Sequence, residues 1–272
     1  MRDYLTFQLY GPLAAWGDIA VGETRPSGLA PTKSAVLGLI AAALGLRRPD
    51  TTQGETLRQQ LEVQHVALAE GYGMAVKLTQ PGLPLTDYHT AQVPASGSGK
   101  NKKVFATRRD ELTWVPRHDL NTILSRRDYR QDAYAAVALW ARVGAPHSLD
   151  ELRDRLLAPE FVLYLGRKSC PLALPLMPVI ASVESIEAAL ADFSFAAAAN
   201  QIWSDDTQTA KWVIGKVAED KPMLFWDVDA ETRVPREDQS AYTRRDTPTS
   251  RRRWQFAVRE ERRAHLPTGG LT

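Results

Sequence analysis

The sequence predicts an α+β protein, and three observations support this prediction. Apolar and polar residues alternate at 4–10, as in a half-buried strand. Residues 33–46 instead form a longer apolar run of the kind found in a covered helix. Strand and helix patterns then alternate again between 133 and 184. A chain of 272 residues with 44% hydrophobic content can bury a substantial core.

The first strand and the first helix have recognisable ends. Gly11-Pro12 stops the strand pattern of 4–10, and a loop with several Gly and Pro residues leads to Thr32. The hydroxyl of Thr32 can cap the helix predicted over 33–46. Because that helix is apolar on most of its sides, we expect the rest of the protein to cover it.

A hairpin and a long arm are predicted next. Apolar residues alternate at 62–69 and at 73–79, which predicts two strands joined as a hairpin. Residues 86–130 follow, with a Ser-Gly tip at 96–99 and many basic residues, but without a steady period or a core face. We therefore predict a protruding arm over 86–130, and long excursions of this kind commonly carry function.

The strand and helix order then repeats. Residues 133–143 are apolar as in a strand covered on both faces, and 148–159 form a helix pattern that Ser148 can cap. Strand patterns follow at 161–166 and 177–184. With the arm set aside, this order of strands and helices is a split βαβ arrangement, close to a ferredoxin-like or RRM-type domain.

This pattern divides the chain into two parts. We assign residues 1–200 to the RRM/ferredoxin-like domain, with the arm at 86–130 as its thumb, and residues 201–272 to a β-rich C-terminal extension. The clearest strand of the extension is WQFAV at 254–258. The sequence leaves open whether the extension is a second domain or adds strands to the first sheet.

Composition argues against several classes of protein. The single cysteine, Cys170, cannot form an intramolecular disulfide, and the N-terminus lacks a signal-peptide pattern, so we expect a cytoplasmic protein. The longest apolar run, at 36–46, is well short of the roughly 20 residues of a membrane helix. The histidines form no zinc motif, and the loop before 33–46 lacks the glycines of a nucleotide-binding phosphate loop. We expect no metal, no cofactor and no membrane contact.

Basic residues gather in two places, although the net charge is only +2. Residues 100–130 hold nine Lys and Arg against four Asp and Glu, and residues 244–263 hold eight Arg against three acidic residues. Such clusters favour polyanions, because each neutralised phosphate releases a condensed counterion. Each cluster taken alone is equally compatible with an ordinary solvated face.

The turn after 161–165 has the composition of a phosphate site. Gly166, Arg167, Lys168 and Ser169 combine a backbone that can approach a ligand closely with two cations and a hydroxyl. The neighbouring Cys170 has no second cysteine and no adjacent histidine. We therefore interpret Cys170 as a small buried packing residue rather than a nucleophile or a metal ligand.

Two further groups of residues are candidates for RNA contacts. Lys33 lies at the start of the predicted helix, where free amide groups favour a phosphate, and Arg25 lies just upstream, although an ordinary capped helix with two solvated cations explains them slightly better. In the arm, Tyr88 and His89 can stack on RNA bases. The alternative role for this pair is catalysis.

That alternative is metal-independent cleavage of RNA. It needs a general base near a 2′-hydroxyl and an acid near the leaving oxygen. Tyr88 and His89, with Lys100 or Lys102, are the candidates for these two roles.

Several motifs together resemble one protein family. They are GPLAAWG at 11–17, TRPSG and PTKSAVLGLIAAALG within 24–45, DYHT at 87–90 and YLGRKSCPL at 164–172. In this order they resemble the CasD family, the fifth Cas protein of type I-E CRISPR Cascade complexes. The similarity is thinner after about residue 200, and the stretch 224–250 is longer than the family usually carries.

The resemblance implies an RRM-like, ferredoxin-type (RAMP) fold with a thumb, and a binding role without catalysis. Family members hold the 5′ handle of the crRNA, cap the backbone filament, and contact its terminal backbone subunit and the large subunit. Target DNA would be reached only through the complex. The residues that the resemblance places on RNA, or in the thumb on RNA or a neighbouring subunit, are Arg25, Lys33, Ser34, Arg108, Arg109, Arg126, Arg127, Gly166, Arg167, Lys168 and Ser169.

Two other functions stay open beside this one. Relatives in the type I-C branch cut repeat RNA themselves, so a metal-independent endoribonuclease that processes CRISPR repeat RNA is the alternative. A pure protein scaffold, with both basic clusters as solvated faces, is the third hypothesis.

Overall fold

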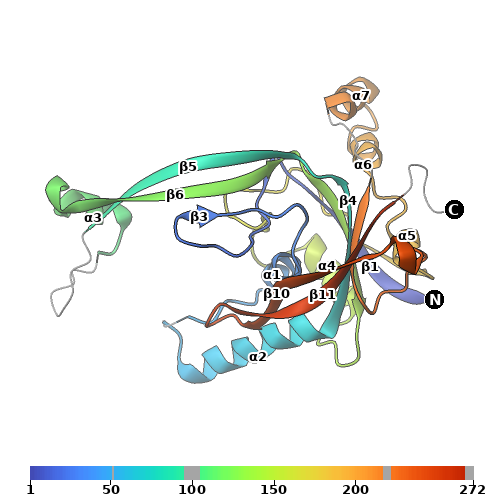
Figure 1. Cartoon of the computed structure of the whole chain (residues 1–272), viewed down its shortest axis with the longest axis horizontal. Helices are drawn as coiled ribbons and strands as arrows, with labels where there is room; N and C mark the ends of the chain where they lie inside the picture. Colours follow the sequence, from blue (N-terminus) through green and yellow to red (C-terminus); the bar gives the residue numbers. More distant parts are fainter. Residues whose placement is uncertain (51, 95–104, 217–221, 267–272) are drawn as a thin grey trace.

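The computed structural model describes residues 1–50, 52–94, 105–216 and 222–266. Within these ranges the main sheet has seven strands in the order β10-β11-β9-β4-β7-β1-β8, and every neighbouring pair is antiparallel. A smaller sheet carries an arm that projects away from the main sheet (Figure 1). The combination of helices and antiparallel sheets confirms the predicted α+β class.

Four strands of the main sheet match predicted strands. They are β1 (Arg2–Tyr10), β4 (Tyr72–Gln80), β7 (Tyr134–Ala141) and β8 (Val179–Val183). β7 lies between β1 and β4, with Val137 opposite both Phe7 and Val76. Because both faces of β7 are buried, its sequence is apolar at almost every position.

The helices that cover the sheet begin where their capping residues predict. In α1 (Lys33–Ala43), the Thr32 hydroxyl accepts a hydrogen bond from the amide of Ala35. In α4 (Leu149–Leu157), the Ser148 hydroxyl accepts one from the amide of Glu151. The apolar sides of both helices pack with β1, β4 and β7 in the largest core cluster. A smaller cluster joins other positions of the strands to Ile186 and Ala189 of α5 (Ile186–Ala189).

Two of the predicted strands are wrong. Residues 55–71 form one helix, α2 (Glu55–Gly71), where a strand was predicted at 62–69. The buried side chains Leu61, His65 and Leu68 follow helical spacing, and the apparent alternation came from exposed residues between them. Residues 161–166 form an extended loop with one isolated bridge, from Tyr164 to Pro171, so burial of Leu163 and Leu165 produced the strand pattern there.

The predicted arm is a long antiparallel hairpin. It consists of β5 (Leu83–Pro94) and β6 (Leu120–Gln131), which pair along their whole length. Its far end carries α3 (Arg108–Trp114) and the short helix η1 (Arg117–Asp119) (Figure 1). Two short strands of the N-terminal loop, β2 (Leu13–Ala14) and β3 (Thr24–Arg25), pair with β6. The predicted Ser-Gly tip at 96–99 lies outside the described residues.

The C-terminal part adds strands to the main sheet. β9 (Met223–Asp227) pairs with β4 and with β11 (Gln255–His265), and β10 (Ser240–Ser250) forms the edge after the short helix η2 (Arg236–Asp238). The strand predicted at 254–258 is the start of β11. The helix α6 (Phe195–Ile202) precedes the predicted β-rich extension, and α7 (Thr207–Lys216) lies within it, where strands were predicted. None of the described helices is long and apolar enough to cross a membrane.

Candidate nucleic-acid groove

A groove with a volume of about 1020 Å³ lies between segments that are far apart in the sequence. One wall is the N-terminal loop at 15–26 with the turn at 164–167, and the other is the β10–β11 hairpin. α1 adds lining residues along most of its length, from Ser34 to Ala42. In Figure 1 the β3 loop lies between the arm and the β10–β11 hairpin. We call this feature the basic groove, because of the charges described next.

Cations outnumber carboxylates in the basic groove. Its charged lining consists of five arginines and two aspartates, Arg25, Arg167, Arg244, Arg245, Arg251, Asp18 and Asp246. Asp246 is already paired with Arg259, whose Nε lies 2.7 Å from Oδ1 of the carboxylate. Aromatic side chains add to the lining at Tyr164, Trp254 and Phe256. A positive groove with aromatic walls suits single-stranded nucleic acid, whose phosphates and bases need these two kinds of contact.

Gly166 has a structural role in the turn. Its φ of +85° lies in the left-handed region, and a Cβ atom there would be 1.9 Å from the carbonyl oxygen of Ala15. The glycine therefore lets the turn approach the N-terminal loop of the same chain. Close approach of a ligand, which the sequence suggested, is not needed to explain this residue.

Arg167 ties the turn to the arm and to the N-terminal loop. Its guanidinium donates hydrogen bonds to the carbonyl oxygens of Asp128, at 3.2 Å, and of Arg25, at 3.0 Å. The same group lies 4.6 Å from the ring centroid of Tyr129. Arg167 thus forms one side of the basic groove and also fixes the position of β3 against β6.

The rest of the predicted turn lies outside the groove lining. Lys168 and Ser169 are exposed. Cys170 is fully buried, and burial raises the pKa of its thiol. The interpretation of Cys170 as a packing residue is confirmed.

Lys33 was predicted to contact RNA, but the structure places its side chain in the protein interior. Its side chain is only 3% exposed, and Nζ lies 2.7 Å from Oδ2 of Asp227. Burial lowers the pKa of Lys33, and the carboxylate of Asp227 opposes this shift. A lysine enclosed in this way cannot reach a phosphate in the groove, whereas its neighbour Ser34 does line the groove.

Lys33 belongs to a larger group that we call the buried ion cluster. Asp227 also pairs with Arg142 and Arg259, and Asp246 accepts a hydrogen bond from the backbone amide of Lys33. In total the cluster holds four cations and four carboxylates, Lys33, Arg142, Arg244, Arg259, Asp227, Asp229, Asp246 and Glu261. It joins the start of α1 to β7, β9, β10 and β11. Each cation in the cluster has a carboxylate partner, and this pairing offsets the cost of removing so many ionised groups from water.

The arm residues separate into two groups. Parallel pairing of β3 with β6 places Arg25 beside Arg127, so these two predicted residues lie together although the sequence separates them. Arg126 is the cross-strand neighbour of Tyr88, and Ser125 that of His89, midway along the hairpin. Arg108 and Arg109 instead lie at the far end in α3, where Arg108 pairs with Glu111. The structure therefore does not bring these two arginines to the basic groove.

Sequence reasoning missed the residues that the β10–β11 hairpin contributes. Arg244, Arg245 and Arg251 were recognised only as part of a C-terminal basic cluster, and Trp254 only as part of a strand. The excess of arginine at 244–263 was the available signal. It could not show that this hairpin faces the N-terminal loop, because that contact joins residues more than 200 positions apart.

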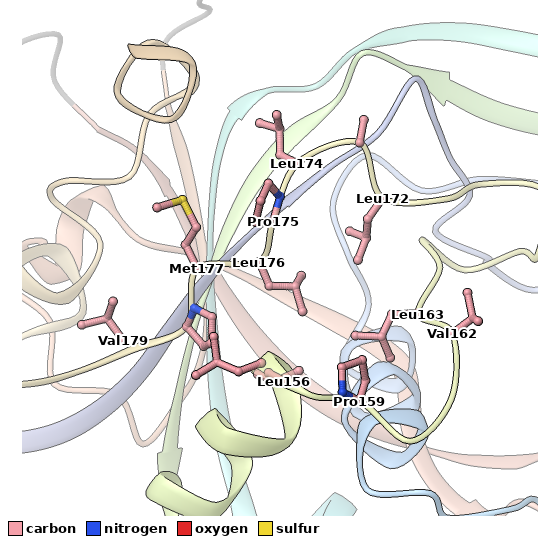
Figure 2. A pocket seen from close by; sticks show the side chains of 13 residues that line it. Leu156, Pro159, Val162, Leu163, Leu172, Leu174, Pro175, Leu176, Met177 and Val179 are labelled. Carbon is pink, nitrogen blue, oxygen red and sulfur yellow. The ribbon is translucent and has the colours of Figure 1, made fainter. Parts of the chain in front are cut away.

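A second groove has a different lining. It has a volume of about 800 Å³ and lies between the end of α4 and the segment at 172–179. Figure 2 shows that leucine, valine, proline and methionine side chains from both segments line it. Because none of the described residues that line it carries a charge, this groove does not fit phosphate.

Comparisons with known proteins support the family resemblance that the motifs indicated. The model of the family described as CRISPR-associated protein (Cas_Cas5) matches residues 4–262. The chain belongs to this family. It is 33% identical over 224 residues to the CRISPR system Cascade subunit CasD of Escherichia coli (strain K12), which covers 82% of this chain and 90% of the relative. The predicted resemblance to CasD proteins is confirmed.

Solved structures share the fold of this Cas_Cas5 family member. A structure described as a CRISPR RNA-guided surveillance complex contains a chain with a TM-score of 0.57 and 20% identity, covering 97% of this chain and 91% of the other. A crystal structure of a Cas protein gives a TM-score of 0.56 and 22% identity, with coverage of 97% and 95%. In both cases the similarity covers nearly the whole chain.

Proposed function

We propose that this chain is a subunit of a Cascade-type CRISPR surveillance complex and holds the 5′ handle of the crRNA without cutting it. Family membership and the E. coli relative, a Cascade subunit, support the assignment to such a complex. The observation that carries the RNA-binding role is the basic groove, which three aromatic side chains and five arginines line, four of these arginines having no ion pair among the described residues. Phosphate contacts from arginine and stacking on aromatic rings are the usual means of holding single-stranded RNA.

The strand order supports a ferredoxin-like framework for this role. Strands β4, β7, β1 and β8 are neighbours in that order. α1 and α2 connect β1 to β4, and α4 connects β7 to β8. This is the split βαβ arrangement, in which the arm is an insertion between the second and third strands. The arm then corresponds to the thumb of the RAMP-type domain.

The arm would also contact neighbouring protein subunits. Trp114 on α3 is 72% exposed, and Leu112 on the same helix and Ile123 on β6 are exposed as well. Exposed apolar groups gathered at the end of a projecting hairpin are typical of an interaction site. The partners in this proposal are the terminal backbone subunit and the large subunit, with the chain capping the filament in the cytoplasm. Target DNA is contacted only through the assembled complex.

The arrangement of the arm favours binding over cleavage. Tyr88 and His89 are adjacent in β5, and adjacent side chains of a strand point to opposite faces. The two groups therefore cannot act together on one phosphodiester bond. Lys100 and Lys102, the other candidates for the endoribonuclease, lie outside the described residues.

One experiment tests binding and cleavage together. A fluorescently labelled RNA with the repeat-derived 5′ end of a crRNA is titrated with the full chain at several salt concentrations, with a chelator present. We expect the logarithm of the association constant to fall linearly with the logarithm of salt concentration, because arginine–phosphate contacts release counterions. The RNA is then recovered and its ends are analysed. Absence of binding, or appearance of a 2′,3′-cyclic phosphate end, contradicts the proposal.

A further inference from the structure

The turn between β10 and β11 presents an exposed tryptophan. Trp254 is 55% exposed, and its φ of +53° places the backbone in the left-handed region. Bulky residues rarely adopt this conformation, and large aromatic side chains are usually well buried. A strained backbone that directs an indole ring toward solvent at the edge of a groove indicates a ligand-binding role.

The surroundings of Trp254 resemble a stacking platform. The guanidinium of Arg48 lies 4.5 Å from the indole centroid, and the Phe256 ring lies 6.3 Å from it at an angle of 32°. Trp254, Phe256 and Val258 follow one another at every second position and all line the basic groove. Val258 is 53% exposed, so the apolar stripe is accessible along much of its length.

The turn is held in place by α2. Glu62 accepts hydrogen bonds from the backbone amides of Arg251 and Arg252, both at 3.1 Å. The side chain of Arg252 also donates to Glu55, at 2.9 Å. A turn fixed at several points presents its tryptophan in a defined position, so less ordering is needed when a ligand binds.

Positive charge beside the stripe is incompletely neutralised. Arg251 donates a hydrogen bond to the carbonyl oxygen of Ser34 and has no ion pair among the described residues, although Glu62 is near. Burial lowers the pKa of Arg251 to about 10, and the nearby charge of Arg48 acts in the same direction. Arg245, also in the groove lining, is exposed and has no ion pair within the described ranges. An anion placed here would relieve this excess.

We propose that the β10–β11 turn is a subsite for one unpaired nucleotide of the bound RNA, with its base stacked on Trp254 and its phosphate held by Arg245 and Arg251. This inference rests on the proposed function and extends it, because it adds the C-terminal hairpin to the RNA-binding surface. RNA is favoured over a peptide because the aromatic stripe and the unneutralised arginines occur side by side. Stacking on an aromatic ring tolerates any base, so the subsite selects an unpaired nucleotide rather than a sequence.

The test uses the labelled RNA with the repeat-derived 5′ end and the full chain. We expect Trp254→Ala to weaken binding about tenfold with an unchanged salt dependence, and Trp254→Phe to restore most of the affinity, because stacking needs an aromatic ring and no charge. Arg245→Ala should weaken binding and reduce the salt slope by about 0.7, the contribution of one phosphate contact on a single strand. Trp212→Ala is the matched control, because Trp212 is also exposed but lies on α7, away from the groove.

A series of RNAs with one abasic position each identifies the stacked nucleotide. At that position, the abasic RNA should bind wild-type protein about tenfold more weakly, and Trp254→Ala should cause no further loss. If wild-type protein binds the RNA and Trp254→Ala binds equally well, this inference is wrong and the proposed function stands. The inference is also wrong if Trp254→Ala weakens binding by the same factor for every abasic RNA, because the loss would then not come from stacking of one base on Trp254. If wild-type protein does not bind the RNA, both proposals fail.

Discussion

The buried ion cluster and the basic groove contain the same kinds of residue and lie against each other, but their charges are used differently. In the cluster, four cations meet four carboxylates, and Lys33 is enclosed with Asp227. In the groove, Arg25 donates its hydrogen bonds to the backbone carbonyls of Gly22 and Thr24. Arg245 has no ion pair among the described residues. The presence or absence of a carboxylate partner, rather than the number of basic residues, distinguishes a structural cation from one available to a ligand.

The largest effect is expected from removal of a central carboxylate of the cluster. Asp227→Asn leaves Lys33, Arg142 and Arg259 without the charge that they share, and breaking a buried pair in this way costs about 3–5 kcal/mol. The free energy of unfolding, measured by urea denaturation, should fall by that amount. Asp150→Asn, which removes an exposed partner of Arg153, is the control and should cost less than about 1 kcal/mol. Equal losses for the two variants would show that the cluster is not a stabilising unit.

A pair of substitutions tests the comparison directly. Arg25→Ala should lower the salt slope of RNA binding by about 0.7 and leave stability within about 0.5 kcal/mol of wild type. Lys33→Met should lower the free energy of unfolding, because it removes one charge of a buried ion pair. It should leave the salt slope unchanged, because Lys33 is not part of the groove lining. RNA titrations at several salt concentrations, combined with urea denaturation of both variants, provide the measurement. A larger change in slope for Lys33→Met than for Arg25→Ala would contradict the assignment of the two residues.

The smallest effect concerns acid stability. Burial alone would raise the pKa of Asp229, but hydrogen bonds from Arg142 and Trp140 outweigh it and lower the pKa to about 2. Because this pKa is below the unfolded value, the carboxylate stabilises the fold above about pH 4 and loses this contribution as the pH falls toward 2. After allowance for solvent screening, we expect a loss of about 1 kcal/mol. Urea denaturation at pH 5 and pH 2.5 should show a smaller difference for Asp229→Asn than for wild type.

Local signals in the sequence predicted much of the fold. The caps at Thr32 and Ser148 marked two helices, and the continuous apolar run at 133–143 marked a strand buried on both faces. The lack of any period at 86–130 indicated the arm. α2 was missed because its apolar residues alternate over a short stretch, and the helical spacing of the buried ones becomes clear only over its full length.

The candidate site was less predictable, because it depends on contacts between distant segments. Arg25, Gly166 and Arg167 were identified from the local sequence and Ser34 from the family resemblance, and the structure places all four at the same groove. The exclusion of Lys33 depends on Asp227, nearly 200 residues later, and no local pattern reveals that pairing. The same reason hid the contribution of the β10–β11 hairpin.

The position of β9 has a consequence for how the chain reaches this structure. β4 ends at Gln80, but the partner on its open side, β9, begins only at Met223. While the ribosome synthesises the intervening residues, one edge of β4 has no strand to pair with, and such edges promote association with other chains. Pairing over so long a separation also slows folding. A chain truncated before Met223 should therefore accumulate as aggregated material, and completion of about the last fifth of the sequence should be needed to release a folded subunit for assembly.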